Sequence, residues 1–147
     1  MKKILLSVLV VLYGITAPAQ SRLTSSKSPE EKLNEQYCTG LFKSSDGKIF
    51  DLENETSPVA YFNILNWLEG RVPGLRVYIL KNGTRVPYMR GQQSGIFVDE
   101  VQVNANFLNS LPTTDIAMIK VFRTAFLGGF NGGGGAIAIY TYNGEDE

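Results

Sequence analysis

The sequence predicts a small α+β domain, a mixed sheet with two or three short helices, over residues 57–147. Three observations predict it. An amphipathic helical pattern opens this region, an Asn-Gly pair separates two β-rich runs, and a second short helix precedes two strands that flank a glycine-dense loop. The order helix, strands, helix, strand, loop, strand is typical of a mixed α+β unit.

Composition and charge exclude several classes of function. The 147 residues include 14 Lys and Arg, 14 Asp and Glu, one Cys and no His. Without histidine, Ser-His-Asp triads, Cys-His pairs and histidine-containing zinc sites cannot form. A formal net charge of zero also lacks the basic field with which nucleic-acid-binding proteins neutralise phosphates. The composition favours a binding, gating or structural role and predicts that the chain is not an enzyme.

The N-terminus has the pattern of an export signal. Lys2 and Lys3 precede an apolar run at residues 4–13, and Ala17-Pro18-Ala19 forms a small-x-small cleavage site. That run is short against the roughly 20 residues of a membrane-spanning helix. We expect residues 1–19 to be a signal peptide that directs the chain to the periplasm or the outer membrane.

Residues 20–56 are predicted to be a polar tether with one short strand. Residues 20–36 contain no aromatic or β-branched aliphatic side chain, so they bury too little surface to stay ordered alone. A strand is expected at residues 48–52, directly after the turn signal Asp46-Gly47.

The first helix of the domain is expected at about residues 58–69. Ser57 is placed to cap it, Pro58 occupies the first helical position, and Gly70 is expected to provide a left-handed exit. The apolar residues at helical spacing are Tyr61, Phe62, Leu65 and Leu68.

Strands and turns follow in alternation. Residues 75–80 and 84–89 are expected to form a hairpin closed by the two-residue turn Asn82-Gly83, with Pro87 indicating an edge. A strand at residues 95–98 ends at Asp99-Glu100. A short helix opened by Asn104 and a further helical turn at residues 114–116 come next. The last strands are expected at residues 118–123 and 136–142, before an acidic tail.

Four segments carry a resemblance to a known family. Residues 64–77 resemble the "L..L.G.VPGL.V" opening of the plug domain of TonB-dependent outer-membrane receptors, with the SusC-like Bacteroidetes type the most similar. Residues 95–101 resemble its "YVIDGVP" segment, with Glu100 in place of the usual glycine. Residues 111–123 resemble "L.P.DI..IEV.R", and residues 128–141 resemble the closing "YG..G.GGVI.I.T".

The resemblance implies a small plug-like domain that gates ligand uptake inside a large barrel. A barrel strand takes about 9 to 11 residues, more than the five that follow Tyr142, so we expect a plug without a barrel. Residues 20–36 are too polar to contain a TonB box. The partners implied are an outer-membrane β-barrel or a TonB-system protein, docked through protein–protein contacts. Two alternatives stay open: a periplasmic binding module for a small ligand, either a sugar or a peptide, and a truncated receptor relic.

A phosphate-binding interpretation of the glycine cluster is disfavoured. Gly133, Gly135 and Ala138 fit the pattern G-x-G-x-x-A, but that mechanism needs a helix after the loop. The sequence after Gly135 alternates like a strand, so we expect a flexible connection between two strands. No cofactor is predicted.

Neighbouring carboxylates and the lone thiol have structural explanations. Asp99 and Glu100 would point to opposite faces of a strand, and in a turn both are expected to face solvent. Asp115 is expected to stabilise a helix start, and Cys38 to be an inert free thiol.

Three aromatic side chains, Tyr61, Phe62 and Trp67, would suit a sugar-binding face, but their helical spacing favours core or interface. If a small ligand binds, residues 89–94 and 124–135 are its expected loops. No catalytic, cofactor-binding or metal-binding residue is predicted.

Overall fold

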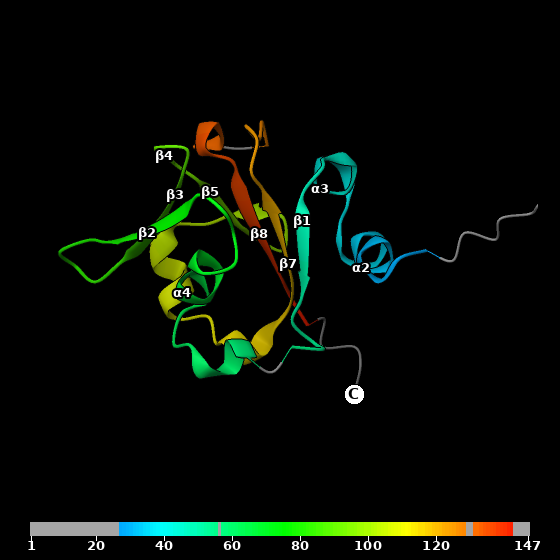
Figure 1. The fold of residues 1–147 in the computed structure, drawn as a ribbon, viewed down its shortest axis with the longest axis horizontal. Coiled ribbons are helices and arrows are strands. Elements are labelled where there is room, and N and C mark those ends of the chain that lie inside the picture. Colours follow the sequence, from blue (N-terminus) through cyan, green and yellow to red (C-terminus); the bar gives the residue numbers. More distant parts are fainter. Residues whose placement is uncertain (1–26, 56, 129–130, 143–147) are drawn as a thin grey trace, which may run out of the picture.

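The computed structural model describes residues 27–55, 57–128 and 131–142, and within them two sheets lie side by side (Figure 1). The expected signal peptide and the acidic tail lie outside these residues. The five-stranded sheet has the order β1-β7-β8-β5-β6. Its strands are β1 (Lys48–Asp51), β5 (Gly95–Val98), β6 (Val101–Gln102), β7 (Ile116–Phe122) and β8 (Ala136–Thr141).

The smaller sheet has the order β2-β3-β4, with β2 (Leu75–Ile79), β3 (Arg85–Met89) and β4 (Gln92–Gln93). The pair β5–β8 is parallel and the remaining pairs are antiparallel. Three α-helices and four 3-10 turns complete the described chain: α2 (Pro29–Tyr37), α3 (Gly40–Ser44), α4 (Ile64–Glu69), η2 (Ser57–Ala60), η3 (Ala105–Asn109), η4 (Thr113–Asp115) and η5 (Gly132–Gly134). The predicted α+β class with a mixed sheet is confirmed.

The inner strand β7 is buried on both faces and separates two cores. Side chains alternate across a strand, so Ile119 and Val121 pack with Trp67 of α4, while Met118 and Phe122 pack on the opposite side. That opposite core is rich in aromatic rings. It holds Phe42, Phe97, Phe122 and Phe126, which form five ring pairs with centroids 4.5 to 6.0 Å apart.

The predicted tether is wrong for the segment that forms α2, α3 and β1. Ser28 caps α2 by accepting a hydrogen bond from the Glu31 N–H. Tertiary contacts then hold the segment on the sheet: Lys120 Nζ donates to Asn34 Oδ1 and to the Phe42 carbonyl, each at 2.7 Å. The expected short strand is confirmed as β1, which pairs antiparallel with β7.

The predicted helix at residues 58–69 is broken into η2 and α4. Asn63 is fully buried and begins α4: its Oδ1 accepts from the Leu65 N–H at 3.0 Å, and its Nδ2 donates to the Leu108 carbonyl at 3.3 Å. The cap of α4 is therefore Asn63 rather than Ser57. Gly70 has φ −76°, so the expected left-handed exit is also wrong; the positive φ falls on Gly74 instead.

The β2–β3 hairpin is confirmed, but its turn has three residues. The Gly83 N–H donates to the Leu80 carbonyl and the Leu80 N–H to the Thr84 carbonyl, both at 2.9 Å. Only Gly83 has a positive φ, at +82°, whereas the two-residue turn expected for Asn-Gly requires it at both positions.

Asp99 and Glu100 form the expected turn, with φ of +47° and +66°; Asp99 is exposed, as expected, whereas Glu100 is half-buried. The Asp99 carboxylate accepts from the backbone N–H and the hydroxyl of Thr141, at 2.9 and 2.8 Å. The Glu100 carboxylate accepts from the backbone N–H of Thr39 at 2.5 Å and from its hydroxyl. Glu100 thus ties the α2–α3 connection to the β5–β6 turn.

Candidate functional site

A cleft of about 670 Å³ opens where the two sheets meet. One wall is the start of β1 and the end of β7, and the other is the α4–β2 connection with the turn between β3 and β4. The lining residues are Asp46, Gly47, Lys48, Pro73, Gly74, Met89, Arg90, Val121, Arg123 and Thr124. Segments far apart in the sequence therefore share one concave surface.

The cleft is cationic. Lys48, Arg90 and Arg123 are exposed and face a single acid, Asp46. Within the described residues, Arg90 and Arg123 make neither a hydrogen bond nor an ion pair. The Lys48 ammonium lies 4.6 Å from the centroid of the Phe50 ring. An anionic group entering the cleft would thus meet guanidinium groups without displacing an existing carboxylate.

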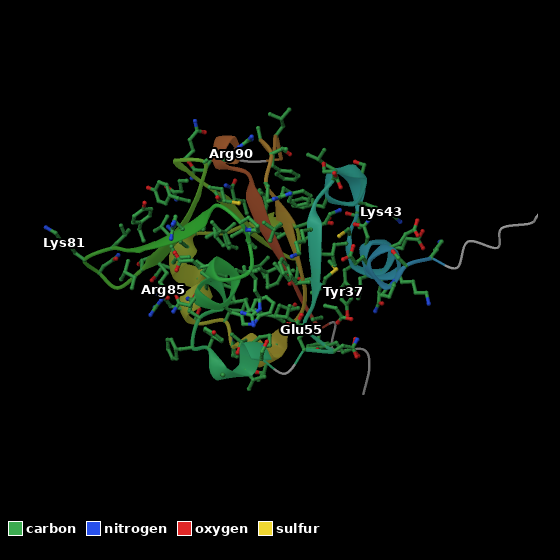
Figure 2. The ribbon with its side chains drawn as sticks, in the orientation of Figure 1. Tyr37, Lys43, Glu55, Lys81, Arg85 and Arg90 are labelled. Carbon is green, nitrogen blue, oxygen red and sulfur yellow. The ribbon has the colours of Figure 1, made fainter. Side chains whose placement is uncertain are left out.

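A strained turn presents Arg90 to the cleft. Met89 pairs with Gln92 across the β3–β4 turn, whose central residues Arg90 and Gly91 have φ of +56° and +78°. Such a turn favours Asn or Gly, and a longer side chain in the left-handed region costs about 1 to 2 kcal/mol. Retained backbone strain is typical of functional sites. Figure 2 shows Arg90 at the end of the molecule where η5 lies.

The glycine cluster supports this turn and is packed closely where it is described. Ser94 Oγ donates to the Gly134 carbonyl at 2.8 Å, and the Gly95 N–H donates to the Gly135 carbonyl at 3.0 Å. A Cβ on Gly134 would overlap the carbonyl oxygens of Gln92 and Gln93. The expectation of a flexible connection is therefore wrong for residues 131–135, whereas residues 129–130 lie outside the described chain. β8 follows directly, so the helix that a phosphate loop needs is not at this position.

The other candidates from the sequence are not brought together. Trp67 is fully buried, while Phe62 is 80% exposed and Tyr61 38% exposed, so the three aromatics form no common face. Asp115 makes no capping hydrogen bond and instead accepts from the Thr114 hydroxyl at 3.1 Å. Across the described residues, no group of three or more His, Cys, Asp or Glu could hold a metal ion.

Cys38 lies buried beside Tyr140 under α2. Burial raises the pKa of the Cys38 thiol, so it stays protonated and unreactive near neutral pH. Burial, together with the neighbouring Cys38 and Glu100, also raises the pKa of the Tyr140 hydroxyl far above its ordinary value. That hydroxyl donates to Glu100 Oε1 at 3.2 Å.

We expect stability to fall as pH rises above about 9. In the unfolded chain Cys38 and Tyr140 lose their protons near pH 8.5 and 10, whereas the folded chain keeps them, so the unfolded state is favoured. Lys120 opposes this, because burial lowers its pKa in the folded state. Urea unfolding at pH 7, 9, 10 and 11 measures the slope. In Tyr140→Phe, stability should fall less steeply as pH rises. An unchanged slope in that variant would contradict the raised pKa of Tyr140 as a cause of the pH dependence.

The sequence did not predict the cationic cleft as a site. Lys48, Arg90 and Arg123 are isolated cations in the sequence, and only the β1–β7 pairing and the position of the β3–β4 turn bring them to one cleft. One signal was available: Arg90-Gly91 stands within the expected ligand loop at residues 89–94.

Comparison with known proteins shows which solved structures this fold is similar to. No family model matches the sequence, and no curated protein matches it. The structure is similar to TonB-dependent receptors of the outer membrane, and this similarity is consistent with a plug-like domain.

Three solved structures illustrate the similarity. The siderophore receptor PirA from Acinetobacter baumannii gives a TM-score of 0.54 at 19% identity, over 77% of this chain and 18% of the receptor. The ferric enterobactin receptor PfeA from Pseudomonas aeruginosa, a double mutant, gives 0.53 at 17%, over 80% of this chain and 19% of the receptor. The RagAB peptide importer in its closed-closed state gives 0.53 at 21%, over 67% of this chain and 12% of the importer chain.

The chain thus spans less than a fifth of the length of these proteins, and at these identities the similarity concerns the fold alone. Among the described residues, no helix has both the length and the apolar character needed to cross a membrane.

Proposed function

We propose that the chain is an exported, non-enzymatic, plug-like module of an outer-membrane TonB-dependent receptor or transport system, and that it acts by docking onto another protein. The similarity of fold to receptors supports this assignment of class. The observation that carries the docking mechanism is the cleft in which Arg90 and Arg123 have no partner within the described residues.

The chemistry of the cleft fits carboxylates on a partner. A guanidinium group binds a carboxylate through two parallel hydrogen bonds, a geometry that fixes orientation as well as adding energy. Two such groups on opposite walls of one cleft would orient a docked protein, and opposite charges would speed its approach. The proposed partner is therefore a larger outer-membrane barrel protein that places acidic side chains in this cleft.

Charge reversal in the cleft tests the proposal. We expect the double variant Arg90→Glu/Arg123→Glu to lose at least about tenfold in recovery of a barrel protein, because an interfacial like-charge contact costs several kcal/mol. The measurement is a tagged pull-down from detergent-solubilised envelope of the native host, with quantitative mass spectrometry against an untagged chain.

The control is Lys32→Glu/Lys43→Glu, which changes the net charge equally on the exposed surfaces of α2 and α3. It should recover the same barrel protein as the unmodified chain. Equal loss in both double variants would show a general effect of charge, and no loss in either would exclude the cleft as the docking surface.

A small-ligand binding module is the second candidate, and the volume of the cleft favours it. About 670 Å³ lies within the range of ligand pockets, and a peptide would bring a terminal carboxylate to Arg90 and Arg123. A ligand that binds only the folded state raises its stability by RT ln(1 + [L]/Kd). A thermal shift with short peptides that disappears in Arg90→Glu/Arg123→Glu, without capture of a barrel protein, would favour this function.

A further inference from the structure

Backbone groups at the outer edge of β2 point away from β3. Across the hairpin Val77 is opposite Pro87, which has no N–H and whose carbonyl accepts from the Ser94 N–H at 2.9 Å on the other side. Val77 and Pro87 are therefore a pair without mutual hydrogen bonds. It follows that the N–H and C=O groups of Val77 and Ile79 point away from β3. Because β2 ends the order β2-β3-β4, this edge is not paired with another strand of the sheet.

Exposed apolar side chains lie along the same edge. Tyr78, Ile79 and Leu80 are 56%, 65% and 49% exposed, and they are consecutive in the sequence. Figure 1 shows the β2–β3 hairpin extending away from the five-stranded sheet. An edge strand with apolar side chains is a template for pairing with another strand.

Two side chains of opposite charge, Glu69 and Lys81, lie at the two ends of this edge. Glu69, the last residue of α4, accepts a hydrogen bond from the Val77 N–H through Oε1 at 2.9 Å. Lys81 lies at the tip of the hairpin and points away from the body of the molecule (Figure 2). Within the described residues Lys81 makes no hydrogen bond or ion pair. The Glu69 carboxylate is thus hydrogen-bonded at the edge, whereas the Lys81 ammonium group at the hairpin tip has no partner within the described residues.

We propose that the β2 edge binds the β2 edge of a second copy of this chain, antiparallel, with the two-fold axis at Tyr78. In this register Val77 pairs with Ile79 of the second copy and Tyr78 lies opposite its own counterpart. The outward N–H and C=O groups of Val77 and Ile79 then form backbone hydrogen bonds in both directions. Tyr78, Ile79 and Leu80 of both copies leave water together.

Charge complementarity identifies a second copy as the occupant. The register places Lys81 of one copy opposite Leu75 of the other, within reach of Glu69 beside it. Each Glu69 carboxylate gives up its hydrogen bond from the Val77 N–H and binds the ammonium group of Lys81 of the other copy. The Val77 N–H then donates to the Ile79 carbonyl of the second copy. Because one surface supplies both the cation and the anion, the contact is isologous and closes as a dimer.

Space at the start of β2 permits this arrangement. A groove of about 270 Å³ follows the chain from Glu69 to Arg76. Nothing lies within 4 Å of the position that a Cβ on Gly74 would occupy. The hairpin tip of the second copy reaches this groove, because Leu80 and Lys81 lie opposite Arg76 and Leu75.

Disulfide trapping tests the register. The material is the full chain, purified from its native host. At the two-fold axis the Tyr78 Cα atoms would be about 4.5 Å apart, within the range for a disulfide. We expect Tyr78→Cys to form a covalent dimer under mild oxidation. Arg76→Cys, on the same face of the same strand, should not, because its counterpart lies four residues away along the partner strand. The native Cys38 is buried and is present in both variants, so any cross-linking through it is the same in both.

Sedimentation over a concentration series tests the dimer without cysteine. We expect the unmodified chain to be dimeric and Tyr78→Lys to raise the dimer dissociation constant by at least about tenfold, because it places like charges at the axis. Tyr61→Lys, an equivalent change on an exposed tyrosine outside the hairpin, should leave it unchanged. A monomeric unmodified chain, or equal cross-linking of Arg76→Cys and Tyr78→Cys, would overturn the proposal.

Discussion

Gly135→Ala should destabilise the protein by about 3 to 5 kcal/mol, which is most of the stability of many small domains. Gly135 has φ +76° and ψ −166°, a backbone conformation that is essentially limited to glycine and costs other residues about 1 to 3 kcal/mol. An added Cβ would also overlap the Phe122 carbonyl oxygen and lie 3.2 Å from the Met89 Cε. Overpacking of this kind adds about 1 to 3 kcal/mol.

Gly70→Ala is the matched control for this substitution. Gly70 has φ −76°, and nothing lies within 4 Å of the position of its Cβ. Alanine there should be neutral or stabilise by about 0.4 to 1 kcal/mol, because it restricts the unfolded chain. Urea unfolding of both variants measures the difference in free energy. Equal stabilities would refute the close packing of the segment that precedes β8.

Trp67→Ala should cost about 3 to 5 kcal/mol, since a fully buried tryptophan leaves a large cavity. Its indole packs edge-on against Phe50, with ring centroids 5.5 Å apart, and the Arg71 guanidinium lies 4.2 Å from the ring centroid. Its Nε1 donates to the Ser57 hydroxyl at 3.0 Å, so truncation also leaves that hydroxyl without this donor. Thermal unfolding and urea unfolding both report the loss.

Phe62→Ala provides the contrast, because the sequence pattern places both aromatics on one helix. Phe62 is 80% exposed, and its truncation should change stability by less than about 0.5 kcal/mol. A large loss of stability in Phe62→Ala would contradict the exposed position of this side chain.

Local signals in the sequence predicted the strands and turns well. The hairpin with Gly83, the strand at residues 95–98 and the turn at Asp99-Glu100 each depend on neighbouring residues, and each is confirmed. Asn104 likewise caps η3, as expected, by accepting from the Asn106 N–H. Backbone conformation at these positions is decided within a few residues, so a sequence pattern is sufficient.

Contacts between distant residues explain most of what the sequence did not predict. The helices α2 and α3 bury few side chains of their own and depend on Lys120 and Glu100, which follow them by more than fifty residues. The interruption at Asn63 depends on the Leu108 carbonyl for the same reason. The cationic cleft combines four separate segments. None of these contacts leaves a periodic pattern in the sequence.

The position of β8 in the sheet has a consequence for how the chain reaches its folded state. β8 is the last strand of the described chain, yet it lies between β7 and β5 and joins them. The five-stranded sheet cannot be completed until residues 136–141 are available, so no segment that ends before β8 can form the whole core. Folding then depends on contacts between distant parts of the sequence, which are slow to form. A chain truncated before residue 136 would expose the apolar edges of β5 and β7, and exposed strand edges of this kind make a chain prone to aggregation.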